Sequence, residues 1–152
     1  MEVFIGADHG GFCLKEQILG WLEEQSFSVE DMGTSSAVSC DYPLFAKAVA
    51  KQVQRDSNHR GVLICTSGVG MAVTANKFQG CYAACLTTQE AVIKARQHNG
   101  INILCLPGNL SLEAVIPLLK AFLNTELDQG ERHVRRRSLI QAIERENFVE
   151  LS

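Results

Sequence analysis

A cysteine and a glycine-containing loop in the middle of the chain have the residue types needed for proton transfer at carbon. The stretch LICTSGVGMAV, residues 63–73, runs from apolar residues ending at Cys65 through a polar loop into a second apolar pattern. Gly68 and Gly70 allow backbone amides to turn inward at the start of an expected helix, where the dipole favours an anion. Helix N-termini can also lower a cysteine pKa from about 8.5 to about 3.5–7.5. A thiolate placed there could remove a proton from carbon while the amides hold the resulting enediolate oxygen.

Three familiar loop chemistries do not fit this stretch. A Walker A loop needs a lysine after Gly70, and a cysteine phosphatase needs an arginine there, but Met71 holds that position. A dinucleotide fingerprint needs a third glycine, and Val73 stands in its place. Two interpretations of Cys65 therefore remain open from the loop alone: a reagent that faces a bound anion, or an inert apolar side chain that ends a buried strand.

Two polar pairs elsewhere in the chain supply further candidate groups. Asp8 and His9, in GADHGG, offer a carboxylate for sugar hydroxyls and an imidazole for a phosphate or a ring oxygen. Alone, such a pair is more often a helix cap and a surface histidine. His98, next to Asn99, could donate a proton to the ring oxygen of a cyclic sugar, because histidine titrates near neutrality. The alternative is a histidine at a helix C-terminus that faces the dipole.

Four arginines form a basic cluster near the C-terminus. Arg132 and Arg136 are four residues apart and share one helix face, so together they could hold a phosphate through forked donors. Arg135 and Arg137 are expected to be solvated, as most charged helix faces are. If the tail packs on a partner subunit, its arginines would complete the partner's site.

These residues must be positioned by a chain in which β-rich runs alternate with helical patterns. Apolar residues recur at helical spacing after each of five short strands, expected over 2–7, 27–33, 61–65, 82–86 and 101–106. Strict alternation predicts a five-stranded parallel sheet with helices on both faces. An extra charged helix is expected at about 131–147, and Pro117 is expected to kink its helix or restrict regular pairing to the later part.

The expected topology groups some of the candidate residues. Ligands of such sheets bind beyond the carboxyl ends of the strands. Asp8 and His9 follow the first strand and Cys65 ends the third, so we expect them at one rim. His98 and Asn99 fall in the turn before the fifth strand, and topology alone does not bring them to that rim.

Composition limits the classes of function. The 152 residues suit a single domain, expected over 1–152, and the net charge of −3 argues against a nucleic-acid-binding surface. No apolar run approaches the ~20 residues that span a bilayer, and the start lacks a secretory signal, so a cytoplasmic protein without a membrane partner is expected. The six cysteines contain no C-x-x-C pair and indicate neither disulfides nor a zinc site.

Taken together, these motifs resemble the ribose-5-phosphate isomerase B family of sugar-phosphate isomerases (RpiB/LacAB). Any one of them is weak, but the ordered set is specific and covers nearly the whole chain. The matching stretches are IGADHGGFCLK, DYP at 41–43, GVLICTSGVGMAVTANK, RQHNGINIL at 96–104 and GERHVRRR at 130–137.

The resemblance implies a Rossmann-like three-layer α/β/α sandwich and an aldose–ketose isomerase that interconverts D-ribose 5-phosphate and D-ribulose 5-phosphate without metal or cofactor. It implies Cys65 as the base that moves a proton between C2 and C1, and His98 as the acid that opens the furanose ring. The other implied substrate-binding positions are Asp8, His9, Asn99, the loop Thr66, Ser67, Gly68, Val69 and Gly70, and the phosphate-binding Arg132 and Arg136. The arginines would come from the other subunit of a homodimer or of a dimer of dimers.

Three departures bear on the substrate. The family loop usually reads C-G-T-G, whereas this chain has Thr66 and Ser67 after Cys65. Asn109 stands where family members commonly carry a phosphate-binding arginine, and Pro107 replaces a usual glycine. Isomerisation of a hexose 6-phosphate of the galactose or allose type, and a catalytically silent sugar-phosphate-binding paralogue, therefore stay open as alternatives. A phosphate-receiving signalling domain is disfavoured, because it needs an aspartate where Cys65 stands.

Overall fold

The computed structural model describes residues 1–148 and contains a five-stranded sheet in which every neighbouring pair of strands is parallel. The strand order is β2-β1-β3-β5-β4. The strands are β1 (Glu2–Ala7), β2 (Ser28–Asp31), β3 (His59–Cys65), β4 (Ala83–Cys85) and β5 (Ile103–Pro107). The predicted parallel sheet is confirmed, and the carboxyl ends of β1, β3 and β5 are neighbours at one edge.

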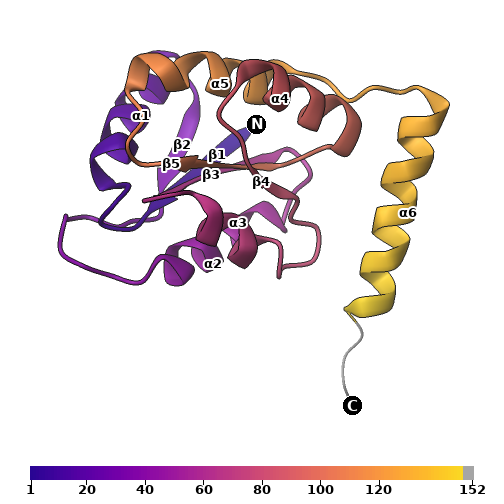
Figure 1. Ribbon diagram of the computed structural model, residues 1–152, viewed down its shortest axis with the longest axis horizontal. Helices are drawn as coiled ribbons and strands as arrows, with labels where there is room; N and C mark the ends of the chain where they lie inside the picture. Colours follow the sequence, from indigo (N-terminus) through magenta and orange to yellow (C-terminus); the bar gives the residue numbers. More distant parts are fainter. Residues whose placement is uncertain (149–152) are drawn as a thin grey trace.

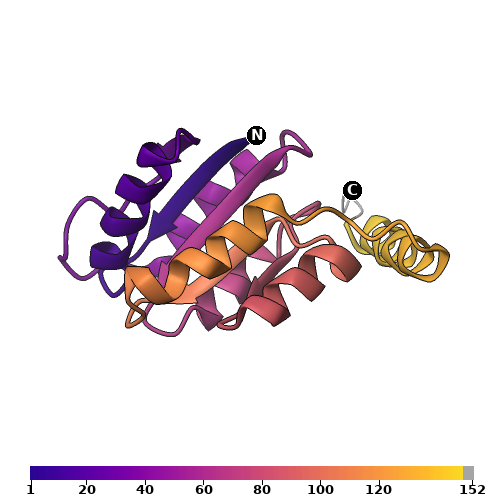
Figure 2. The same cartoon turned by 90° about the horizontal axis from the view of Figure 1, so that it is seen from above.

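Helices cover both faces of this sheet (Figures 1 and 2). One face carries α1 (Phe12–Glu24), α4 (Gln89–Lys94) and α5 (Leu112–Asn124), and the other carries α2 (Tyr42–Val53) and α3 (Val69–Ala75). The predicted α/β/α sandwich is confirmed.

The residues of β3 show why the sheet needs two covering layers. Val62 and Ile64 belong to the apolar cluster formed with α1 and α5, whereas Leu63 and Cys65 belong to the cluster formed with α2 and α3. Successive side chains of a strand point to opposite faces, so an uninterrupted apolar strand must be buried on both. Cys65 therefore faces the α2–α3 layer at the very end of its strand.

Local chemistry sets the helix boundaries. The Thr88 hydroxyl accepts a hydrogen bond from the amide of Ala91 at 3.3 Å and caps α4. A π-helical turn, η1 (Ala95–Asn99), prolongs α4. Helix α5 runs through Pro117, so of the two expected effects the restriction to its later part is wrong, and the kink stays a prediction. The carbonyl of Glu113 that loses its donor lies on an exposed residue, where water can replace the bond.

The last helix, α6 (Glu131–Asn147), stands beside the sandwich rather than on it (Figures 1 and 2). Among its residues only His133 is buried, and Leu139, Ile140 and Ile143 are exposed. The bounds of α6 match the predicted helix. That residues 1–152 form one domain stays a prediction, because 149–152 lie outside the described residues. Within residues 1–148, no helix has the length and apolar character needed to cross a membrane.

Candidate active site

The carboxyl edge of the sheet holds a hollow of about 510 Å³, within the size range of small-molecule sites. It lies where the loops after β1 and β3 meet the start of α2. The residues that line it are Asp8, Tyr42, Cys65, Thr66, Ser67, Val69, Gly70 and Val73. The chain thus brings Asp8 together with Cys65 and its loop, as the topology predicts.

Cys65 is placed so that its sulfur meets a backbone donor. The thiol side chain is only 5% exposed, and the amide of Gly68 donates a hydrogen bond to its Sγ at 3.2 Å. Gly68 has a φ of +79°, a left-handed conformation that turns its amide back toward the sulfur just before α3 begins. A thiolate accepts such a bond more strongly than a neutral thiol does. A backbone donor therefore faces the sulfur of a residue that lines the hollow.

Two other cysteines lie near Cys65, and their surroundings keep them neutral. Burial, reinforced by Cys65, raises the pKa of the Cys85 thiol. Burial raises the pKa of Cys105 far above its ordinary value, and Cys85 and Cys65 add to the shift. Cys65 therefore stands out among these three, because it alone lines the hollow.

Close packing between loops fixes the shape of the hollow. A side chain at Gly10 would place its Cβ 2.4 Å from Oγ1 of Thr66 and 3.2 Å from the Thr66 amide nitrogen, so the loop after β1 packs closely on the loop after Cys65 at this glycine. A Cβ at Gly70 would lie 2.6 Å from the ring of Tyr42. The extra side chain of Thr66, a departure from the family pattern, is accommodated against Gly10.

Asp8 and His9 are held in different ways. Asp8 is buried, and its Oδ1 accepts hydrogen bonds from the amides of Gly10 at 2.9 Å and Gly11 at 3.2 Å. His9 is exposed, and its Nδ1 accepts from the amide of Cys40 at 3.2 Å. In the neutral ring this leaves Nε2 as a donor. Asp8 lines the hollow, whereas His9 is not among the lining residues.

The end of β5 and the loop after it, at the same edge of the sheet, carry the remaining departures from the family pattern. Pro107 lies opposite Cys65 in the pairing of β5 with β3, and the amide of Gly108 donates to the carbonyl of Cys65 at 2.8 Å. Asn109 is exposed next to this contact. It offers an amide in place of a charge.

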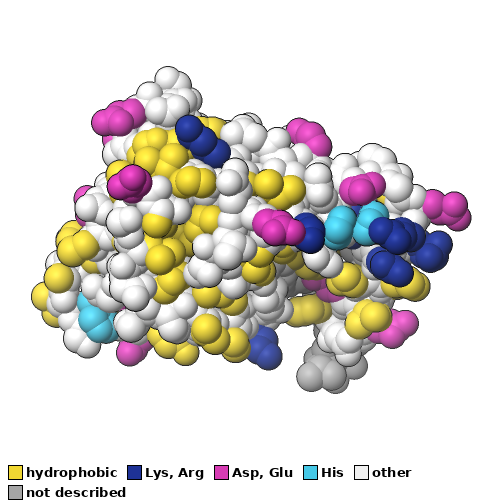
Figure 3. Space-filling model, turned by 45° about the horizontal axis from the view of Figure 1, so that its top comes forward, with side chains coloured by type: hydrophobic (Ala, Val, Ile, Leu, Met, Phe, Trp, Pro, Cys, Tyr) yellow, Lys and Arg dark blue, Asp and Glu magenta, His cyan; other side chains and the backbone are white. Residues whose placement is uncertain are grey.

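The other predicted site residues lie away from the hollow at Cys65. They are His98, Asn99, Arg132 and Arg136. Ile103, at the start of β5, pairs with Gly61 rather than with Cys65, so η1 precedes β5 at the opposite edge of the sheet. Asn99 lines a second hollow of about 700 Å³ between α6 and the sandwich, together with Arg96 and Arg137. Figure 3 shows histidine and basic side chains gathered at this end of the molecule. One chain does not unite all the predicted site residues.

The imidazole of His98 lies against α6. Its ring stacks on that of His133, with centroids 4.1 Å apart and planes 2° from parallel. Burial lowers the pKa of His133, and the nearby His98 adds to the effect, so the stacked pair does not readily carry two charges. His133 was not among the predicted site residues, although it lies within GERHVRRR.

His98, Asp128 and His133 could be taken for a metal site, because one ligand atom of each lies within 4.8 Å of the others. Ring nitrogens bind metals along lone pairs in the plane of the ring. Parallel rings stacked face to face cannot aim both lone pairs at one ion, so the residues do not fit a metal. Asp128 instead lies 3.9 Å from Nε2 of His133 and accepts a hydrogen bond from the amide of Gly130 at 2.7 Å.

Tyr42 and Val73 line the hollow but were not among the predicted site residues. Tyr42 belongs to the DYP stretch, which the resemblance marked without giving it a role. Val73 lies one helical turn after Val69, so its place on the same face of α3 follows from helix periodicity. Both side chains are exposed.

The sequence profile of the Ribose/Galactose Isomerase family matches residues 3–140. The chain belongs to this family. Ribose-5-phosphate isomerase B of Escherichia coli is 37% identical over 144 residues, which cover 94% of this chain and 96% of that protein. A 4-deoxy-4-sulfo-D-erythrose isomerase from a Clostridium species is 40% identical over 110 residues, covering 71% of this chain and 69% of that protein.

The solved structures show the same fold for this family member. Ribose-5-phosphate isomerase B of Mycoplasma genitalium, whose structure holds ribulose-5-phosphate, superposes with a TM-score of 0.90 at 36% identity. The match covers 96% of this chain and 97% of that one. The resemblance inferred from the motifs is thereby confirmed at the level of family and fold.

Proposed function

We propose that this family member interconverts D-ribose 5-phosphate and D-ribulose 5-phosphate, with Cys65 as the base. The observation that carries the proposal is the place of Cys65, which lines a substrate-sized hollow together with Asp8 and whose Sγ accepts a hydrogen bond from Gly68. The activity named for the Escherichia coli relative and the ribulose-5-phosphate in the Mycoplasma genitalium structure support the choice of substrate.

The chemistry follows from the groups around the hollow. The Cys65 thiolate removes the proton on C2 of the open-chain aldose and returns it to C1, while a proton moves from the C2 hydroxyl to O1. Gly70 and Met71, near the start of α3, have amides with no earlier carbonyl of the helix to bond. Such amides can hold the enediolate oxygen, and Asp8 can hold a sugar hydroxyl.

A second copy of the chain would complete the site. His98 and Asn99 on η1, and Arg132 and Arg136 on α6, would face the Cys65 hollow of the partner. Apolar side chains at both surfaces support this arrangement, because patches of this kind mark interfaces. On α6 they are Val134, Leu139, Ile140 and Ile143, and around the hollow they are Tyr42, Leu44, Val69 and Val73.

A substrate panel tests the proposed activity. The purified protein is assayed on ribose 5-phosphate, galactose 6-phosphate and allose 6-phosphate, each with and without a chelator. We expect the highest kcat/KM on the pentose, with no loss when the chelator is present. A higher kcat/KM on a hexose phosphate would mean that the substrate is the hexose phosphate and not the pentose. Binding without turnover would indicate a silent paralogue. Loss of activity in the presence of the chelator would contradict metal-free chemistry.

A four-carbon sugar with a sulfonate is a second candidate, because Asn109 offers no positive charge to a phosphate. The family arginine that helps to hold the phosphate is replaced by this neutral, exposed amide. The Clostridium relative is named for a four-carbon sugar with a sulfonate in place of a phosphate. Adding 4-deoxy-4-sulfo-D-erythrose to the panel decides the question, since the better substrate will have the higher kcat/KM.

A further inference from the structure

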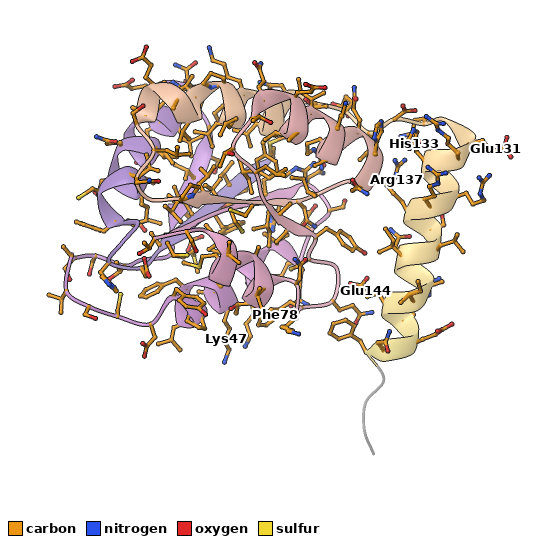
Figure 4. All side chains as sticks on the ribbon, viewed as in Figure 1. Lys47, Phe78, Glu131, His133, Arg137 and Glu144 are labelled. Carbon is orange, nitrogen blue, oxygen red and sulfur yellow. The ribbon has the colours of Figure 1, made fainter. Side chains whose placement is uncertain are left out.

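Arg137 is half-buried and does not lie on the solvated face of α6, contrary to the prediction. Its Nη1 donates to the carbonyls of Gln97 at 3.0 Å and His98 at 3.3 Å, and its Nη2 donates to the carbonyl of Asp128 at 2.8 Å. Figure 4 shows Arg137 pointing from α6 toward the sandwich, whereas Glu131 points away. One guanidinium thus joins η1, the linker before α6, and α6 itself.

The hydrogen bonds of Arg137 are of a strong kind and hold η1 and the linker firmly against α6. Gln97 and His98 lie in the last turn of η1, where carbonyls lack amide donors from later helical residues. A guanidinium presents its donors in a rigid fork, and hydrogen bonds from a charged donor are roughly twice as strong as neutral ones.

The two elements that Arg137 joins, η1 and α6, carry groups that are proposed to act on the same substrate molecule. The His98 ring is the proposed acid for the ring oxygen, and Arg132 and Arg136 are the proposed phosphate ligands. In one sugar phosphate, the few covalent bonds between the ring oxygen and the phosphate limit the distance between them. The acid and the arginines must therefore keep a separation within that limit, and Arg137 links their backbones directly.

We propose that Arg137 is a positioning residue, which sets the His98 imidazole relative to the phosphate-binding face of α6. The inference rests on the proposed function. The stacking of His98 on His133 supplies a second contact between the same two elements. At the far end of α6, Glu144 accepts from the amide of Gly80 at 2.7 Å and from the hydroxyl of Tyr82 at 2.8 Å, so α6 keeps an anchor when Arg137 is replaced.

A double-mutant cycle separates positioning from general support of the fold. Arg137→Met keeps an unbranched side chain and removes the fork. In the otherwise unchanged protein we expect kcat on ribose 5-phosphate to fall by about tenfold to a hundredfold, because misplacement by about 1 Å costs that much. In a His98→Ala background, the same change should alter kcat by less than about twofold and act only on KM, through the arginines.

The control is Arg135→Met, which removes the same charge from an exposed position of the same helix. It should leave kcat within about twofold of the unmodified protein. Melting temperature and oligomeric mass are measured for every variant. An equal fall of kcat in both backgrounds, or in the control, would overturn the positioning role. Absence of isomerase activity in the unmodified protein would instead refute the proposed function.

A substrate that cannot form a ring gives an independent readout. D-erythrose 4-phosphate has no free hydroxyl with which to close a furanose, so it needs no ring-opening acid. If it is turned over, Arg137→Met should lower kcat on it far less than on ribose 5-phosphate. Equal losses of kcat on the two substrates would contradict the coupling to His98.

Discussion

At the scale of single residues, Cys65 differs from its neighbours by what touches its sulfur. It is as buried as an ordinary core cysteine, so exposure does not reveal it. The hydrogen bond from Gly68 and the hollow beside Asp8 set it apart, whereas burial raises the pKa of Cys85 and Cys105.

Replacing this sulfur should remove the base without removing the site. For Cys65→Ala we expect kcat on ribose 5-phosphate to fall by about 10²–10⁴-fold, the usual contribution of a positioned base. Binding of ribulose 5-phosphate, measured by calorimetry, should change little. Cys13→Ser, an exposed thiol on α1, is the matched control. Turnover of Cys65→Ala at the level of this control would refute the assigned base.

The meeting of Asp8 with Cys65 could be predicted from sequence because parallel strands present their carboxyl ends at one edge. The surroundings of Arg137 could not, because nothing in a run of arginines tells which one lies against a neighbouring turn. The stacking of His133 on His98 could not be predicted either. Its stacking depends on the angle at which α6 leaves the sandwich, and the linker from 125 to 130 sets that angle without a periodic signal.

At the scale of elements, the contact between η1 and α6 should depend on pH. Burial lowers the pKa of His133. The positive charges of His98, Arg132 and Arg136 lower this pKa further, and Asp128 raises it. The ordinary pKa of histidine is about 6.5. Below that pH the unfolded chain binds a proton at this histidine more readily than the folded chain does. The contribution of His133 to the free energy of unfolding is therefore complete above about pH 6.5 and is lost as the pH falls.

We therefore expect the free energy of unfolding to decrease between about pH 7.5 and 5.5, above the range where carboxylates titrate. His133→Gln should show a shallower decrease over the same range. Urea unfolding at a series of pH values measures both slopes. Identical slopes in the two proteins would show that His133 does not titrate differently in the folded and unfolded states.

At the scale of the whole molecule, one chain carries the two halves of the proposed site at opposite edges of its sheet. Asp8 and the Cys65 loop lie at the carboxyl edge, and η1 with α6 lies at the other end. Sequence predicted both halves by motif and the layered fold by periodicity. It did not place η1 relative to the hollow, because the two lie at opposite ends of the strands within one chain and no periodic signal reports the distance between them.

Complementation between two inactive variants tests this shared site most directly. Cys65→Ala keeps the arginines, and a chain with Arg132→Ala and Arg136→Ala keeps the sulfur. After unfolding and refolding together in equal amounts, half of the dimers are mixed and each has one intact site, so we predict about a quarter of the unmodified activity on ribose 5-phosphate. Activity no higher than the sum of the two variants refolded separately would contradict a site built from two copies.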